Sequence, residues 1–272
     1  MILGIEWNMS SELIDGWSTP NLYGLLFVTG LIIGFFVIKR IFKHERVPEE
    51  WLDKLLIYMV VATIVGARLG HVLFYGPYLG PDGYFSNPGN IIKVWEGGLA
   101  SHGGAIAILI ALFIYSKKVS KKSMFWILDR VVAPIAIAGC FIRLGNLVNH
   151  EIVGKPTDLP WGFKFMRSYQ YSDVFRHPAQ LYEAISYLLI FILLISLFWK
   201  TNLKQKTGYI FGVFLVVLWG ARFLVEFVKI PQENYDLGIA LNTGQLLSIP
   251  FIIAGFVIIY LANKGKLAGK NV

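Results

Sequence analysis

The sequence is poor in charged residues and has almost no cysteine. Aspartate, glutamate, lysine and arginine make up 15% of its 272 residues and hydrophobic residues 56%, whereas soluble domains average about 25% and about 45–50%. A water-soluble fold of this composition would expose too much apolar surface, which argues against a soluble enzyme or a nucleic-acid-binding module. The single cysteine, Cys140, excludes an internal disulfide framework and a cysteine-rich metal site.

Motifs for bound metals and nucleotides are missing as well. No His-Glu-x-x-His motif occurs, the five histidines are scattered, and no glycine motif of a P-loop or dinucleotide site follows a predicted strand. Cys140 lies among apolar residues, so we predict that it fills the core rather than acts as a nucleophile. We expect no metal, no soluble cofactor and no nucleic-acid partner.

The chain instead contains seven apolar runs that are long enough to cross a bilayer, which takes about 20 residues and tolerates roughly 17–25. Backbone groups in hydrocarbon must be paired within the segment, so each run is predicted to be a helix. The sequence therefore predicts an all-α, polytopic integral membrane protein with a single membrane domain over residues 1–272. The predicted spans are Leu22–Ile38, Leu52–Tyr75, Leu99–Tyr115, Met124–Val148, Pro178–Trp199, Gly208–Val228 and Asn242–Leu261.

Lysine and arginine are distributed unevenly between the links that join these spans. Fifteen lie in the links after the first, third and fifth spans and in the C-terminal tail, and six lie in the links on the other side. Cytoplasmic loops carry the excess of positive charge, so we predict that the N-terminus is outside and the C-terminus in the cytoplasm.

Two segments would then lie outside the cell membrane: an N-terminal arm, residues 1–20, and a loop, residues 149–177. The arm has no lysine or arginine, so it is not predicted to be a cleavable signal peptide, which needs a positive first region. Trp7 and Trp17 would hold the arm along the membrane interface.

Ionisable side chains within the spans need an explanation, because a charge at the bilayer centre costs about 2.5–3.5 kcal/mol unless it is paired, solvated or functional. Arg222 and Glu226 are four residues apart, which allows either an intrahelical ion pair or a functional site. Asp129 and Arg130 lie near the start of the fourth span, where snorkelling to the interface is expected. The whole set is Arg68, His71, His102, Asp129, Arg130, Arg143, His177, Glu183, Arg222 and Glu226.

The fourth span ends in a polar segment. Arg143 and Asn146 are three residues apart and share one helix face, and Asn149 and Glu151 follow. A guanidinium can donate two parallel hydrogen bonds to a phosphate, so this segment favours a site for a lipid head group. The alternative is an ordinary snorkelling arginine with a capping asparagine.

The segment Gly97–Gly104 places four glycines around His102. Glycine removes side-chain bulk and allows close backbone approach, and imidazole can carry a proton near neutral pH. We therefore take His102 as a candidate proton acceptor, with a satisfied structural histidine as the alternative.

Other polar groups leave two interpretations open. The segment His177–Glu183 opens the fifth span and could attract an anion or cap the helix and order the preceding loop. Tyr23 is either an interfacial aromatic residue or a hydrogen-bond donor into the lipid head-group site suggested for Arg143 and Asn146. Structural pairing and a functional role are equally open for Arg68 and His71.

Four segments together resemble the motifs of bacterial phosphatidylglycerol–prolipoprotein diacylglyceryl transferases. Ile142 and Leu147 stand where that family usually has glycine and phenylalanine; both are apolar, so the difference concerns local packing. The resemblance covers all seven spans and is carried by Glu96–Gly104, Arg143–Gly154 with Gly145, Asn146, Asn149, Glu151 and Gly154 in place, His177–Glu183, and Arg222-Phe223-x-x-Glu226.

The resemblance implies a lipid-modifying transferase of the bacterial plasma (inner) membrane, with its active site towards the outer leaflet. Its substrates would be phosphatidylglycerol and the lipobox cysteine in the signal peptide of a prolipoprotein. The products would be a thioether-linked diacylglycerol and glycerol 1-phosphate. Because phosphate is already a good leaving group and the thiol belongs to the substrate, no cofactor is required.

This reaction needs cations for the phosphate and a base for the thiol. Our hypothesis takes Arg143, Arg222 and His102 as the catalytic residues. The two arginines would bind the phosphate, and His102 would accept the thiol proton. Glu226 would hold Arg222 in place. The remaining substrate-binding residues would be Tyr23, Gly98, Gly104, Asn146, Glu151 and Gly154.

Two other classes of function compete with this one. A small anion transporter or channel would show inverted repeats and helices broken at mid-membrane, and no internal symmetry is visible in the sequence. A non-catalytic lipid-binding scaffold would not explain why His102 is flanked by glycines.

Overall fold

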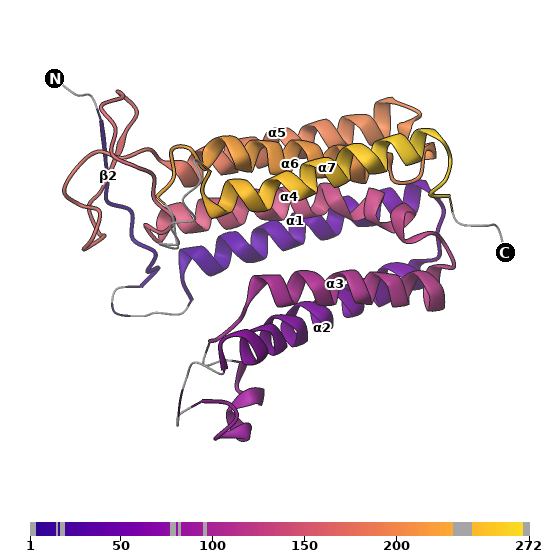
Figure 1. Ribbon diagram of the computed structural model, residues 1–272, viewed down its shortest axis with the longest axis horizontal. Coiled ribbons are helices and arrows are strands. Elements are labelled where there is room, and N and C mark those ends of the chain that lie inside the picture. The colour runs from indigo at the N-terminus through magenta and orange to yellow at the C-terminus, as the bar shows by residue number, and fades with distance from the viewer. Residues whose placement is uncertain are drawn as a thin grey trace. The chain divides into compact units, whose positions relative to one another are not determined.

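The computed structural model describes residues 4–14, 16, 20–76, 80, 83–94, 97–230 and 241–268. Trp17 of the arm and Glu96 of the histidine segment lie outside these residues. The described part contains seven α-helices, one overlapping each predicted span, which confirms the all-α class (Figure 1). They are α1 (Leu22–His44), α2 (Glu49–Phe74), α3 (Ser101–Tyr115), α4 (Met124–Val148), α5 (Ala179–Lys200), α6 (Tyr209–Val225) and α7 (Thr243–Asn263).

Six of these helices are long and apolar enough to cross a membrane when α3 is taken together with the π-helical turn η5 (Ser116–Ser120) that continues it. The other helix, α6, has 17 residues, which corresponds to about 26 Å at 1.5 Å per residue and is near the lower limit for a span. The prediction of a polytopic membrane protein is confirmed.

The chain forms two compact units. Residues 39–127 form the α2–α3 unit, and residues 1–38 with 128–272 form the five-helix unit, which holds most of α1 together with α4, α5, α6 and α7. A single membrane domain over the whole chain stays a prediction.

Glycines bring α2 and α3 into close contact. A Cβ atom on Gly70 would lie 2.7 Å from the Cα atom of Gly103, and one on Gly66 would lie 2.2 Å from the Cβ atom of Ala107. Neither position has room for a larger side chain, and small residues of this kind are what allow membrane helices to approach closely.

In the five-helix unit, α6 packs against both α5 and α7 (Figure 1).

Asp129 of α4 is 2% exposed, and its carboxylate accepts hydrogen bonds from the backbone N–H groups of Gly208 (2.6 Å) and Phe211 (2.8 Å). It therefore satisfies the free N–H groups at the start of α6. The predicted snorkelling of Asp129 and Arg130 is wrong: both are buried, because the carboxylate has a helix end to cap.

A small non-helical layer covers the end where α4 stops and α5 starts. Two three-residue strands, β1 (Ile5–Trp7) and β2 (Phe163–Phe165), pair in parallel there, and the sequence did not predict them. The Trp7 indole donates a hydrogen bond to the Leu147 carbonyl (3.0 Å) and packs on Phe163, with ring centroids 5.3 Å apart. Trp7 thus ties the arm to the loop 149–177, and the position of the arm along the membrane interface stays a prediction.

The remaining short elements are the 3-10 helices η3 (Pro88–Ile92) and η6 (Leu203–Gln205). The core of the non-helical layer consists of buried Leu147, Val153, Phe163 and Phe165. This core fixes the loop directly over the polar end of α4.

Candidate active site

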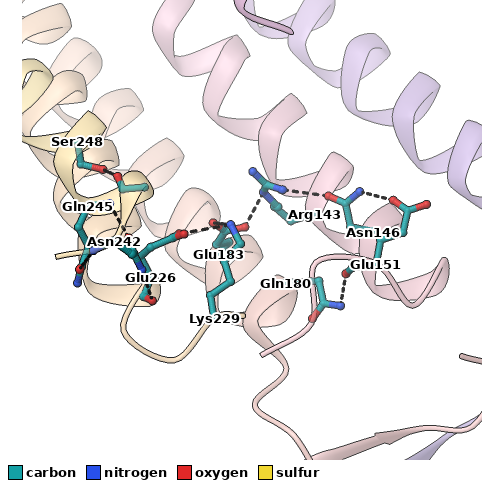
Figure 2. Close-up of polar contacts among 11 residues, drawn as sticks. Arg143, Asn146, Glu151, Gln180, Glu183, Glu226, Lys229, Asn242, Gln245 and Ser248 are labelled. Atoms are coloured by element: carbon teal, nitrogen blue, oxygen red, sulfur yellow. Dashed lines mark hydrogen bonds and ion pairs between the residues drawn. The ribbon is translucent and has the colours of Figure 1, made fainter. Parts of the chain in front are cut away.

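Four charged side chains, three of them buried and Arg143 largely buried, form a connected chain at this end of the five-helix unit (Figure 2). Arg143 Nε of α4 lies 2.7 Å from Glu183 Oε2 of α5. The other oxygen of Glu183 is 3.6 Å from Lys229 Nζ, and that ammonium is 3.4 Å from Glu226 Oε2. Glu183 and Lys229 are 1% and 2% exposed, so each charge depends on its neighbours rather than on water.

Arg143 also connects to the segment that follows it. Its Nη1 donates to Asn146 Oδ1 (3.1 Å), and Asn146 Nδ2 donates to Glu151 Oε2 (3.1 Å). Asn149 Nδ2 donates to the other oxygen of Glu151 (2.9 Å). The shared face of Arg143 and Asn146 is confirmed, and Glu151 joins it.

The backbone turn after α4 is what returns Glu151 towards the helix. His150 and Ile152 have positive φ angles of 57° and 58°, and the Glu151 N–H donates to the Asn146 carbonyl (2.9 Å). Gln180, on the first turn of α5, is fully buried and donates to the Glu151 carbonyl. Of the two interpretations of the His177–Glu183 segment, the structure supports loop ordering through Gln180, while Glu183 pairs with a cation.

Gly154 lies where three backbone segments meet. A Cβ atom there would be 2.4 Å from the His177 carbonyl oxygen and 2.9 Å from that of Val228. Its N–H donates to the His177 carbonyl (3.0 Å), and the neighbouring Lys155 N–H donates to Val228 (2.7 Å). Gly154 therefore allows the loop to pack against the turn that carries Lys229.

Two aromatic rings pack against α4 next to Arg143. The Tyr23 ring of α1 lies on Gly145, where a Cβ atom would be 2.7 Å from the ring. The Tyr187 ring of α5 lies over Gly139 and, with its centroid 6.0 Å from Arg143 Cζ, beside the guanidinium. The space that glycine leaves at position 139 is thus occupied by an aromatic ring of the protein itself.

Of the two interpretations of Arg222 and Glu226, the intrahelical ion pair is not the one that the structure shows. Among the described residues Glu226 pairs with Lys229, and no ion pair joins it to Arg222. Glu226 is the C-cap residue of α6, and its partner Lys229 lies in the turn that follows the helix. Arg222 Cζ instead lies 5.6 Å from the ring centroid of Trp219.

His102 belongs to the α2–α3 unit, at the start of α3, and is exposed. Its ring packs against Phe74 and Tyr75, with centroids 4.9 and 6.1 Å apart. The glycines next to it do not clear space around the imidazole. Gly103 faces α2, and Gly98 has a positive φ of 71° with the His71 ring against it.

Arg68 organises the loop before α3. Its guanidinium donates to the carbonyls of Ile91 (2.8 Å), Gly97 (2.6 Å) and Gly98 (3.1 Å), and also to that of Asn90. A buried guanidinium with four carbonyl acceptors has its donors satisfied by the backbone. For Arg68 the structure therefore supports the structural interpretation.

Lys229 and Tyr187 were not among the site residues predicted from the sequence. Lys229 was counted only as a loop charge, although it follows Glu226 by three residues and is the lone basic residue of its link. That isolation is the signal that could have identified it. Tyr187 has no such signal, because it is one of many aromatic residues on apolar helices.

Two further findings concern the chemistry of this region. Burial lowers the pKa of His177, whose Nδ1 lies 3.2 Å from the Tyr182 hydroxyl. Within the described ranges, no group of three His, Cys, Asp or Glu side chains is arranged to hold a metal ion.

Known proteins resemble the chain over almost its whole length. A family model described as prolipoprotein diacylglyceryl transferase matches residues 16–261. The phosphatidylglycerol–prolipoprotein diacylglyceryl transferase of Porphyromonas gingivalis is 46% identical over 98% of this chain and 97% of its own. That of Tolumonas auensis is 46% identical over 96% and 98%, and that of Chloroherpeton thalassium 42% identical over 96% and 95%. The chain belongs to the prolipoprotein diacylglyceryl transferase family.

Proposed function

We propose that this protein transfers the diacylglyceryl group of phosphatidylglycerol to the lipobox cysteine of a prolipoprotein, the first step of lipoprotein maturation. The family supports the reaction. The observation that carries the assignment to this end of the protein is the largely buried guanidinium of Arg143, fixed by Glu183 and Asn146.

The phosphate would be bound by Arg143 and Arg222. Glu183 lies against Nε of Arg143 and Asn146 accepts a hydrogen bond from Nη1, so the guanidinium is held in place to bind a phosphate oxygen. Arg222 has no ion pair among the described residues, so its charge is available to an anion. Asn146 and Glu151 would orient the glycerol head group, with the Tyr23 hydroxyl as a further donor.

In the reaction, the cysteine sulfur attacks the CH₂ carbon of the diacylglyceryl group that carries the phosphate oxygen. The carbon–oxygen bond breaks, the electron pair leaves with glycerol 1-phosphate, and a thioether forms. The thiol proton goes first to His102 and then to the departing phosphate, so atoms and charge balance. The two arginines would stabilise the negative charge that builds up on the phosphate.

We place this site at the outer leaflet of the bacterial plasma membrane. The argument is the excess of lysine and arginine in the links at the opposite helix ends. In this orientation the loop 149–177 and the arm face the compartment in which an exported prolipoprotein would arrive.

The decisive test is mass spectrometry of a lipobox peptide after incubation with the purified protein and phosphatidylglycerol. We expect a diacylglyceryl mass increment on the peptide cysteine and release of glycerol phosphate. No increment from a folded preparation would refute the transferase assignment, and anion flux across vesicles would then test a transport role.

Three variants test the residue roles. His102→Asn should abolish transfer while phosphatidylglycerol still binds, and full turnover would remove the base assignment. Arg143→Ala should weaken phosphatidylglycerol binding, and an unchanged affinity would remove the phosphate role. Cys140→Ala, which changes a buried thiol of α4, should keep full activity.

A further inference from the structure

Lys229 is a charged residue that has no role in the reaction proposed above. Its side chain is 2% exposed, and its ammonium lies between Glu226 Oε2 (3.4 Å) and Glu183 Oε1 (3.6 Å). Figure 2 shows it between the two carboxylates that come from α5 and from the end of α6. The two acidic neighbours compensate the buried ammonium for the loss of contact with water.

The position of Glu226 makes this lysine more than a packing residue. Glu226 follows Arg222 by four residues, the spacing at which a carboxylate and a guanidinium on one helix can pair. In the structure the carboxylate is held by Lys229 instead, Asn242 Nδ2 donates to the Glu226 carbonyl (3.2 Å), and Gly244 packs against the carboxyl group. Glu226 is thereby kept beside Lys229.

We propose that Lys229 is a positioning residue that holds Glu226 away from Arg222 and so keeps Arg222 available to the phosphate of the lipid. The proposal rests on the proposed function, because it concerns the affinity of the same site for phosphatidylglycerol. Lys229 acts through Glu226 and does not itself touch the substrate.

The charges of the cluster agree with this role. The ion pairs join the cations Arg143 and Lys229 to the anions Glu183 and Glu226, so the charges of these four side chains balance. Arg222 has no ion pair among the described residues, and the negative charge of a bound phosphodiester would compensate it. Without the charge of Lys229, Glu226 would lose its ion-pair partner and could pair with Arg222.

The experiment is a titration of phosphatidylglycerol at fixed lipobox peptide, with the full-length protein in detergent. Lys229→Gln should raise KM for the lipid about 10- to 100-fold, the value of one charge-assisted hydrogen bond, with a smaller change in kcat. Lys229→Arg, which keeps the charge, should restore a KM near that of the unaltered protein. A change in kcat alone, or no rescue by arginine, would overturn the proposal.

A double variant separates this role from a general effect on folding. If Lys229 acts only through Glu226, adding Lys229→Gln to Glu226→Gln should change KM by less than about twofold. A further large rise in the double variant would overturn the proposal. This comparison also decides the matter if Lys229→Gln alone does not fold, because the double variant leaves no unpaired carboxylate at position 226.

Equilibrium binding of phosphatidylglycerol to the same proteins distinguishes this proposal from the function on which it rests. If the unaltered protein binds the lipid but transfers nothing, the transferase assignment fails. The proposal about Lys229 would then stand or fall on whether Kd rises about 10- to 100-fold in Lys229→Gln and recovers in Lys229→Arg.

Discussion

Replacement of Glu183 by glutamine tests whether the buried chain of charges stabilises the five-helix unit. The carboxylate is 1% exposed and lies 2.7 Å from Arg143 Nε and 3.6 Å from Lys229 Nζ. Glutamine keeps the shape of the side chain but leaves two buried cations with Glu226 as the remaining carboxylate of the chain. Removal of one partner from a buried ion pair costs about 3–5 kcal/mol, which is the expected loss for Glu183→Gln.

The assay is thermal unfolding of the full-length protein in detergent. A loss of about 3 kcal/mol corresponds to a fall in Tm of about 6 °C or more for a chain of this size. Glu50→Gln is the matched control, because Glu50 also pairs with a lysine, Lys54, but the two side chains are 68% and 46% exposed. An exposed pair of this kind contributes less than about 1 kcal/mol.

Equal losses of stability in Glu183→Gln and Glu50→Gln would refute the reasoning, since burial would then have no effect on the strength of the pair. A second check is the double variant Glu183→Gln/Lys229→Gln. It removes one charge of each sign, so it should recover part of the stability that Glu183→Gln loses.

Three further predictions concern stability, each measured by unfolding in detergent. Gly154→Ala should destabilise the protein by about 1–3 kcal/mol through overpacking, because the new Cβ would lie 2.4 Å from the His177 carbonyl oxygen. Gly220→Ala is the control: a Cβ there would have no neighbour within 4 Å, so this variant should not destabilise the protein. Asp129→Ala should cost about 2 kcal/mol by uncapping α6, and a loss no larger than that of Asp129→Asn would contradict the cap. Burial lowers the pKa of His177 in the folded protein. At pH values between that lowered pKa and about 6.5, the unfolded chain therefore binds more protons than the folded protein. Stability should therefore be retained above about pH 6.5 and fall as the pH drops through the lowered pKa, and His177→Gln should flatten this dependence.

The partners of the charged residues were the least predictable feature of the site. The sequence places Glu226 four residues after Arg222 and suggests an ion pair, yet its carboxylate lies 3.4 Å from Lys229. A spacing rule considers only residues of one helix, and the partner of Glu226 lies in the turn after α6. The same limitation explains Asp129, whose carboxylate caps a helix from a distant part of the chain.

The glycines next to His102 were predicted to clear space around its imidazole, and this prediction failed for a similar reason. From the sequence they are flexible residues beside an imidazole. In the structure Gly103 allows α2 to approach α3, and Gly98 forms a turn whose carbonyl accepts a hydrogen bond from Arg68. The neighbour that requires a glycine comes from another segment, so the local sequence does not contain the reason.

The sequence by itself determined the class of this protein and the family that it resembles. Seven apolar runs specify seven helices because hydropathy is a property of a continuous segment and hydrocarbon forces its backbone into a helix. The motif from Arg143 to Gly154 could also be recognised, because its residues are neighbours in the chain. Only the tertiary structure decided which charges meet: Glu183 with Arg143 and Lys229, and Glu226 with Lys229. Arg143, Glu183 and Lys229 come from α4, α5 and the turn after α6, so the distances between them depend on how these segments pack.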